Sequence, residues 1–183
     1  METPAAGRLL IADPFLKDPN FARTVILLCE HRDEGSLGFV INRPSAYTLD
    51  ACAPGTVPEG IPVYTGGPVS QDTLHFIHRF PGLLEGGLEI LPGVFWGGDF
   101  ERLTELLELG LIDVAGLRFF SGYAGWSEGQ LEKELQEHTW IVSEGAPELV
   151  FLREAGRIWQ QSLRDLGGEY APMAGYPVDP SLN

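Results

Sequence analysis

The hydrophobic positions of the chain fall mostly into short runs bounded by glycine, proline or charged residues, a pattern typical of β-strands. The clearest run covers residues 24–31, where both faces of a strand are apolar over most of its length, so we expect other elements to cover it on both sides. A polar turn at 32–35 leads into a second strand at 37–42, which predicts a hairpin. Further strands are predicted at 8–12, 61–65, 73–80, 88–91, 94–96, 114–123, 140–142 and 148–152.

Three stretches have helical spacing instead. Asp99 is placed to cap a helix that ends near Leu109. Ser127 and Gln130 form a capping box for a helix that reaches about His138, and a third helix is predicted over 153–166. Residues 43–62 are predicted to form a loop with a short helical stretch at 48–52, and residues from about 168 to 183 to form an irregular tail.

The order of these elements predicts the fold class. Strands and helices follow one another without regular β-α-β alternation, and several strands are joined by short turns, which favours an α+β fold with a mainly antiparallel sheet. The sequence contains no internal repeat and no linker long enough to divide two domains, so one domain is predicted over residues 1–183.

Composition narrows the classes of protein that the chain could belong to. Hydrophobic residues make up 44% of it, enough for a core and too many for wholesale disorder. No apolar run is long enough to span a membrane, and the first residues lack the features of a secretory signal. The only two cysteines, Cys29 and Cys52, are too few for a disulfide scaffold, so we expect a reduced, cytoplasmic protein.

The acidic charge of the chain argues against direct binding to nucleic acid. The formal net charge is −14, whereas proteins that bind duplex DNA gain most of their affinity from Lys and Arg at phosphates. An anionic membrane surface would repel the chain for the same reason. Only the first 44 residues are close to neutral, so a surface that binds anions would have to be local.

Cys29 and His31 are the first candidates for chemistry. Two positions apart on a strand they would project from the same face, and an imidazolium near a thiol lowers its pKa and makes it reactive. The alternative is structural, because free cysteine is among the most buried residues and Cys29 lies in an apolar run.

Metal and phosphate sites are not indicated. His75 and His78 would lie on opposite faces of a strand, and no cluster of Cys and His has ligand spacing, so no metal and no cofactor are expected. Gly66-Gly67-Pro68 follows a strand, but Pro68 has no N–H for a phosphate, and a tight turn is the simpler interpretation.

Arginines beside the first hairpin form a second candidate. Arg43 follows Asn42 where a strand opens into the long loop, and together with Arg23 it could offer a forked cation to an anion. The alternative is that both arginines pair with nearby carboxylates such as Asp18, Glu30 or Asp33. The tryptophans, Trp126 among them, are expected to serve the core.

These motifs together resemble the bacterial YqgE/AlgH family. The resemblance is collinear from about residue 7 to residue 167. It is carried by the run 7–25 (GRLLIADPFLKDPNFARTV), Cys29-Glu30-His31, Gly35, Gly38, Asn42-Arg43-Pro44, Gly66-Gly67-Pro68-Val69, Leu74-His75, Gly122-Tyr123-Ala124-Gly125-Trp126, Gln130-Leu131-Glu132, Trp140, Trp159 and Leu166-Gly167.

The resemblance implies a single α+β domain whose mixed, bent sheet partly closes into a barrel with helices outside. It also implies a cytoplasmic protein with no settled biochemical activity. Some members carry the label of transcriptional regulator, but this sequence has no helix-turn-helix, and its charge argues against regulation by direct contact with DNA.

The sequence therefore leaves two hypotheses for the function. The first is a non-enzymatic binding or regulatory module that recognises a small anionic ligand or a protein partner, on a pocket or patch built by the first hairpin and the Gly66–Pro68 turn. The second is a thiol-dependent enzyme or redox sensor that uses Cys29 with His31. The candidate binding residues are Arg23, Asn42, Arg43, Gly66, Gly67, Pro68, His75, Trp126 and Gln130.

Overall fold

The computed structural model describes residues 2–53 and 57–178. The predicted loop at 54–56 and the tail at 179–183 lie outside these residues. The strands are β1 Leu9–Ala12, β2 Val25–Arg32, β3 Gly35–Val40, β4 Pro44–Thr48, β5 Pro62–Thr65, β6 Val69–His78, β7 Leu88–Leu91, β8 Val94–Trp96, β9 Leu117–Ser127 and β10 Trp140–Ser143. The helices are α1 Leu49–Cys52, α2 Phe100–Glu108, α3 Gln130–Gln136, α4 Pro147–Val150 and α5 Ile158–Leu166, with 3-10 turns at Val114–Gly116, Ala155–Arg157 and Ala171–Gly175.

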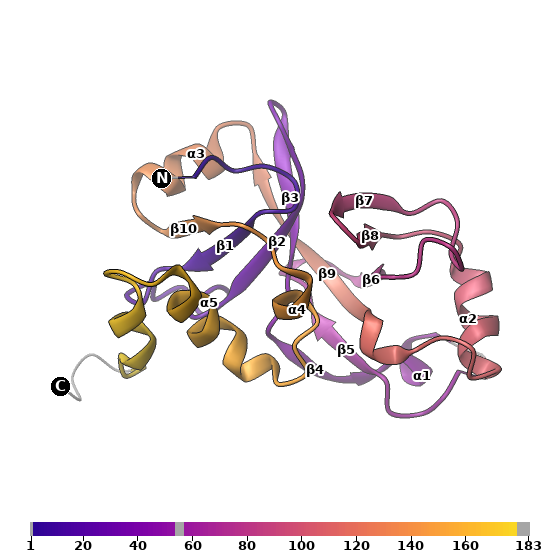
Figure 1. Ribbon diagram of the computed structural model, residues 1–183. Helices are drawn as coiled ribbons and strands as arrows, with labels where there is room; N and C mark the ends of the chain where they lie inside the picture. The colour runs from indigo at the N-terminus through magenta and orange to yellow at the C-terminus, as the bar shows by residue number, and fades with distance from the viewer. Residues whose placement is uncertain (1, 54–56, 179–183) are drawn as a thin grey trace.

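One sheet runs through both ends of the molecule in the order β10-β1-β2-β3-β9-β6-β8-β7, and β5 joins β9 and β4 beside this path (Figure 1). The β5–β9 pair is parallel, while the other pairs among the described strands are antiparallel, so the predicted mainly antiparallel α+β fold is confirmed. The strand order is an open path that ends at β10 and β7, and the predicted partial closure into a barrel is not confirmed.

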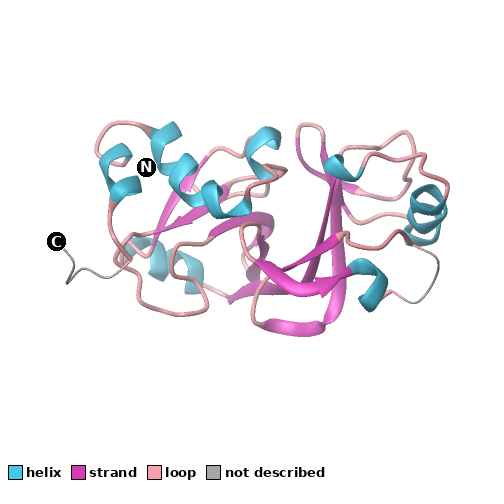
Figure 2. Cartoon of the chain, turned by 90° about the horizontal axis from the view of Figure 1, so that it is seen from below, coloured by secondary structure: helices cyan, strands magenta, loops and turns pink. Residues whose placement is uncertain are grey.

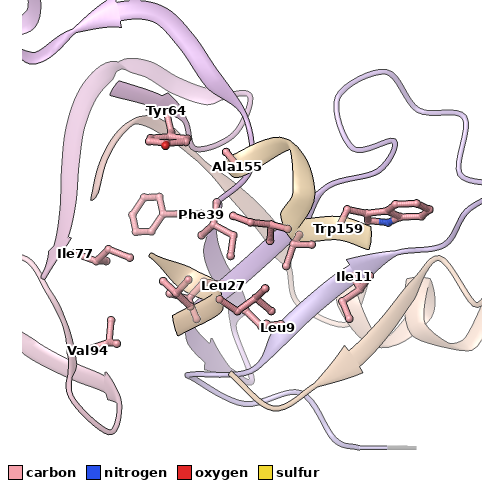
Figure 3. Packing of buried hydrophobic residues seen from close by; sticks show 14 of the residues in the cluster. Leu9, Ile11, Leu27, Phe39, Tyr64, Ile77, Val94, Ala155 and Trp159 are labelled. Carbon is pink, nitrogen blue, oxygen red and sulfur yellow. The ribbon is translucent and has the colours of Figure 1, made fainter. Parts of the chain in front are cut away.

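The first hairpin, β2–β3, is covered on both faces. Leu27 and Phe39 belong to a cluster on which α5 packs through Trp159 (Figure 3). Ile26, on the other face, belongs to a cluster that includes Leu131 of α3. The expectation that residues 24–31 form a strand covered on both sides is therefore confirmed.

The far end of the sheet has its own core. α2 packs Leu103, Leu106 and Leu107 against Phe119 of β9. Asp99 caps α2 as predicted, because its carboxylate accepts a hydrogen bond from the Arg102 N–H at 3.0 Å. Figure 2 shows α2 at one end of the cartoon and the helices near the C-terminus at the other, with the strands between them.

Several elements differ from the prediction. Residues 114–116, expected in a strand, form a 3-10 turn, and the helix expected over 153–166 is α-helical only from Ile158. Residues 148–152, expected as a strand, lie largely in helix α4, because Pro147 at the first turn presets a helical φ and Ala146 accepts the first backbone bonds. Residues 44–48, expected as loop, form β4, because β5 lies beside them and pairs with Pro44 and Thr48. The short helical stretch at 48–52 is confirmed as α1.

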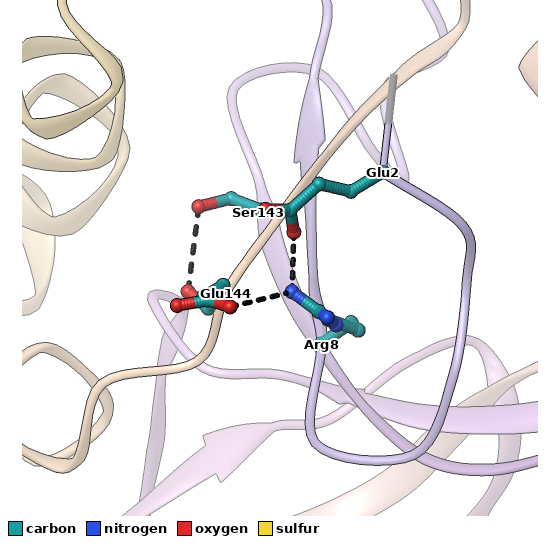
Figure 4. A network of polar contacts seen from close by, with 4 residues as sticks. All are labelled: Glu2, Arg8, Ser143 and Glu144. Atoms are coloured by element: carbon teal, nitrogen blue, oxygen red, sulfur yellow. Dashed lines mark hydrogen bonds and ion pairs between the residues drawn. The ribbon is translucent and has the colours of Figure 1, made fainter.

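Two buried or half-buried cations fasten segments to the sheet. Arg118 of β9 is 4% exposed and lies over the Tyr64 ring at 4.4 Å, while its Nη1 and Nη2 donate to the carbonyl oxygens of Ile41 at 2.7 Å and Leu152 at 2.8 Å. Burial lowers the pKa of Arg118. At the N-terminus, Arg8 contacts Glu2 and Glu144, the latter at 3.3 Å (Figure 4).

The backbone at Gly66 and Gly67 passes directly against β9, because neither residue has a side chain to keep the two backbones apart. The Gly66 N–H donates to Ser121 O at 2.9 Å, and the Gly66 carbonyl accepts from Val40 N–H at 2.8 Å, so this residue bridges β9 and the end of β3. A Cβ on Gly67 would lie 2.1 Å from the carbonyl carbon and oxygen of Tyr123. These positions therefore require glycine for close approach of two backbones.

We expect Gly67→Ala to lower the free energy of unfolding by about 1–3 kcal/mol, because the added methyl group overlaps the Tyr123 carbonyl and the backbone has to move. Urea unfolding followed by circular dichroism measures the change. Gly82→Ala is the matched control, since a Cβ there meets no atom within 4 Å, and its change should stay within about 0.5 kcal/mol. Equal stability of the two variants would contradict the close crossing.

His78 is a fully buried histidine held in its neutral form. Its Nδ1 accepts the Phe80 N–H at 3.1 Å, so Nε2, which lies 3.0 Å from Gly97 O, carries the proton and donates it there. Burial lowers the pKa of His78 below its ordinary 6.5, against an opposing effect of the bond to Gly97. His78 is therefore protonated at a higher pH in the unfolded chain than in the folded chain.

Stability is expected to fall as pH is lowered below about 6.5, because the unfolded state then binds more protons than the folded state. In His78→Asn, the slope of unfolding free energy against pH between 7.5 and 5.5 should become smaller, although the variant is less stable overall. Some slope will remain, since burial also lowers the pKa of His75. Urea titrations at several pH values give the slope, and an unchanged slope would contradict this assignment.

Candidate functional site

The residues selected from the sequence do not meet in one place. The structure separates them into a group around the turn at residues 20–24, a group at the β6–β9 crossing and a group beside α3. Cys29 lies in the core and His31 on another face of the sheet.

Arg23, Asn42 and Arg43 surround the turn at 20–24. The Asn42 side chain accepts the Val25 N–H and donates to Arg23 O, both at 2.9 Å. Arg43 donates from Nη2 to Ala22 O at 3.0 Å and from Nη1 to Asn20 O at 2.5 Å. Burial lowers the pKa of Arg43, and the attraction of Asp18 opposes that shift in part. Arg43 therefore braces a turn of its own chain.

Arg23 is used in a similar way. Its Nη2 donates to Tyr176 O of the C-terminal segment, and its guanidinium lies over the Trp159 ring at 4.6 Å. Arg23 itself has a positive φ of 55°, and the Asn42 side chain holds its carbonyl in place. Among the described residues both guanidinium groups donate to carbonyl oxygens, and no ion pair with a carboxylate is formed by either.

A β-bulge overturns the predicted pairing of Cys29 with His31. The β2–β3 register shifts between Leu28 and Glu30, so the chain gains one residue and alternation is interrupted there. Cys29 therefore packs in the same core cluster as Leu27. His31 lies opposite Ser36, with Nδ1 2.7 Å from Ser36 Oγ, and its Nε2 lies 3.7 Å from Glu132 beside α3.

The environment of Cys29 is that of an inert thiol. It is 1% exposed, its Sγ lies 3.7 Å from Leu27 O, and burial raises the pKa of the thiol far above its ordinary value. A thiol in such a site stays protonated at neutral pH and is shielded from reagents.

In a Cys52→Ser variant we expect iodoacetamide to leave Cys29 unlabelled while the protein is folded, and to label it fully in denaturant. Timed quenching and mass spectrometry measure both rates. Cys29→Ala, which retains only the exposed Cys52, is the control and should react like an ordinary free thiol. Faster labelling of native Cys29 than of Cys52 would restore the thiol-dependent alternative.

The second group lies where β6 meets β9. His75 is half-buried between the rings of Phe39 and Tyr123, with centroid distances of 5.2 and 6.1 Å, and its Nε2 lies 3.0 Å from Thr73 Oγ1. Burial lowers the pKa of His75. Gly66 and Gly67 are buried at the crossing described above, and Pro68 is exposed beside them.

The third group fastens α3 to the sheet. Glu134 accepts the indole N–H of Trp126 at 2.8 Å and that of Trp140 at 2.7 Å on one oxygen, while Gln130 donates to its other oxygen at 3.0 Å. The capping interaction predicted for Gln130 forms in part, since its Oε1 accepts the Ser127 N–H at 3.0 Å. Trp126 and Gln130 thus belong to a local structural network.

A trough on the β2–β3–β9 face has a volume of about 620 Å³. The first hairpin forms one wall and Val69, directly after the Gly66–Pro68 turn, lies on the other. Gly35, Leu37 and Gly125 share one face, because Gly35 pairs with Ser127 and Leu37 with Gly125. Its lining residues are Glu30, Arg32, Glu34, Gly35, Ser36, Leu37, Val69, Tyr123, Gly125 and Trp126.

Of the candidates chosen from the sequence, only Trp126 lines this trough. Sequence reasoning missed Tyr123 and Leu37, whose proximity depends on the pairing of two strands far apart in the chain. A usable signal was present in Gly35 and Gly125, because glycines within strands often mark close approach of another chain or ligand.

The described residues contain no group of three or more His, Cys, Asp or Glu side chains that could hold a metal ion. Within the same residues, no helix is both long and apolar enough to cross a bilayer.

The open, mostly antiparallel sheet with its flanking helices places the protein in the α+β class. The AlgH-like family model matches residues 9–171, so the chain belongs to this family, as its resemblance to the YqgE/AlgH proteins predicted. The UPF0301 protein of Chlorobaculum tepidum is 45% identical over 177 residues, covering 97% of this chain and 95% of that protein. The UPF0301 protein of Cytophaga hutchinsonii is 40% identical over 178 residues, covering 97% and 98%.

Solved structures share the fold. A crystal structure of a Corynebacterium diphtheriae protein matches with a TM-score of 0.82 at 22% identity, covering 96% of this chain and 94% of that one. The solution structure of the AlgH protein from Pseudomonas aeruginosa matches with a TM-score of 0.73 at 29% identity, covering 97% of this chain and 98% of that one.

Proposed function

We propose that this protein is a non-enzymatic, cytoplasmic binding module with a regulatory role, and that a segment of a protein partner occupies the trough between the first hairpin and Val69. The observation that carries the proposal is the trough itself. It combines an open volume of about 620 Å³ with apolar, aromatic and charged side chains from four strands, β2, β3, β6 and β9. Such a mixture suits an extended segment whose side chains differ from one position to the next.

The positions of the charged groups favour a protein partner over a small anion. Arg23 and Arg43 already donate to carbonyl oxygens of Tyr176, Asn20 and Ala22, so an anion would have to displace bonds that hold the fold. In the trough, Arg32 is engaged by Glu30 at 3.1 Å. Neither location offers an anion an unengaged guanidinium group.

The inertness of Cys29 counts against the thiol-dependent alternative. A nucleophilic thiol needs solvent access and a base in contact, whereas Cys29 is buried and His31 faces Ser36 and Glu132. A role in transcription would then act through a protein partner, since the net charge of −14 opposes contact with DNA phosphates.

The test is an NMR titration of the ¹⁵N-labelled protein with a panel of acetylated octapeptides of basic, acidic and neutral aromatic composition. We expect at least one class to shift the amide signals of Leu37, Tyr123 and Gly125 with a Kd below about 1 mM. Val69→Arg should abolish these shifts, because Val69 is 36% exposed and its replacement would fill the trough.

Leu109→Arg is the matched control, since Leu109 is 67% exposed outside the trough, and it should bind like the wild type. Failure of every peptide to produce saturable shifts at the trough would contradict the proposal, as would equal loss of binding in both variants.

A further inference from the structure

We propose that the trough recognises a basic segment, with a Lys or Arg side chain of the partner lying against Tyr123 and Glu34. This inference rests on the proposed function and names the chemistry of its partner. It follows from the distribution of charge within the trough, the position of the Tyr123 ring and the charge of the whole chain.

The trough has one unengaged carboxylate. Arg32 Nη2 lies 3.1 Å from Glu30 Oε2, so these two side chains neutralise each other. Glu34 lies in the exposed turn between β2 and β3 and forms no hydrogen bond or ion pair with any other described residue. A cation entering the trough would therefore gain an attraction that no side chain of the described structure now supplies, whereas an anion would meet Glu34 unshielded.

Tyr123 adds an aromatic surface to that charge. Its ring extends over Gly125, since a Cβ on this glycine would lie 3.3 Å from Tyr123 Cε2. The Tyr123 and His75 rings form a T-shaped pair with an interplanar angle of 87°, and Tyr123 is only half-buried, so part of its ring remains open to solvent beside the trough. The face of a tyrosine attracts Lys ammonium and Arg guanidinium groups, and its area packs their alkyl stems.

Apolar side chains beside these groups fit the same occupant. Leu37 and Val69 line the trough together with Tyr123, and the absence of a side chain on Gly125 leaves room for the Tyr123 ring. Long basic side chains bury their methylene stems on such surfaces while keeping the charged end in contact with a carboxylate.

The charge of the whole protein favours the same partner at longer range. The formal net charge is −14, and one of its few cations, Arg118, is buried under Tyr64 away from the surface. A surface with this excess of carboxylates steers basic segments towards the protein and repels acidic ones, with an effect that weakens as salt is added.

Three octapeptides that are identical except at one central position, which is Lys, norleucine or Glu, test the inference by calorimetry and NMR. We expect the Lys peptide to bind at least about tenfold more tightly than the norleucine peptide in low salt, with the advantage reduced at high salt. An Arg version should bind at least as well as Lys, because guanidinium stacks on aromatic rings.

Two variants assign the preference to named side chains. Glu34→Gln should bring the affinities for the Lys and norleucine peptides within about threefold of each other, because it removes the unengaged charge and keeps the size. Tyr123→Leu should weaken the Lys and Arg peptides more than the norleucine peptide. Glu128→Gln is the control, an exposed carboxylate outside the trough that should leave the preference unchanged.

The outcomes separate this inference from the proposed function. Equal binding of the Lys and norleucine peptides at the trough, or tighter binding of the Glu peptide, would overturn the basic partner and leave a binding trough. A preference for Lys that persists in Glu34→Gln and Tyr123→Leu would overturn the assignment to these side chains. Absence of trough shifts with every peptide would overturn both proposals.

Discussion

The fold depends on a place where two stretches of backbone touch with no side chain between them. At Gly66 and Gly67 the chain passes so close to Gly122 and Tyr123 that even one methyl group would overlap a carbonyl. With this contact in place, β9 pairs with β3, β5 and β6 and joins the three hydrophobic clusters of the molecule through a single sheet. The trough exists because β6 and the first hairpin are held on either side of that strand.

The conspicuous polar residues mostly maintain this arrangement. Asn42 and Arg43 hold the turn at 20–24, Arg118 ties the end of the first hairpin to Leu152, and Glu134 joins two tryptophans. Their carbonyl and indole partners satisfy groups that would otherwise be buried at a cost. The residues proposed to bind a partner are therefore less buried ones that line the trough, and within the described structure the side chains of Glu34 and Tyr123 form no such hydrogen bond.

The sequence was informative where structure is local. The β2–β3 hairpin, the cap by Asp99 and the short α1 helix follow from neighbouring residues, and each was predicted. Pro147 was a local helix signal that the apolar run at 148–152 obscured. By contrast, β4 becomes a strand only because β5 lies beside it. The trough likewise needs the register of Leu37 with Gly125, which no local pattern contains.

The candidate site shows the same division. Arg23, Asn42 and Arg43 lie around one turn, in agreement with the prediction that they belong together. The sequence did not indicate that the two guanidinium groups would donate to the carbonyl oxygens of Asn20, Ala22 and the distant Tyr176. Simple alternation placed Cys29 and His31 together, and one inserted residue separated them.

That inserted residue also divides the hairpin into two parts with different freedom to change. Below the bulge, side chains of β2 are packed into cores on both faces, and substitutions there disturb the interior. Beyond it, Arg32, Asp33 and Glu34 are exposed and belong to none of these clusters. Substitutions at these exposed positions can therefore change what this end of the molecule recognises, while the packed part of β2 stays the same.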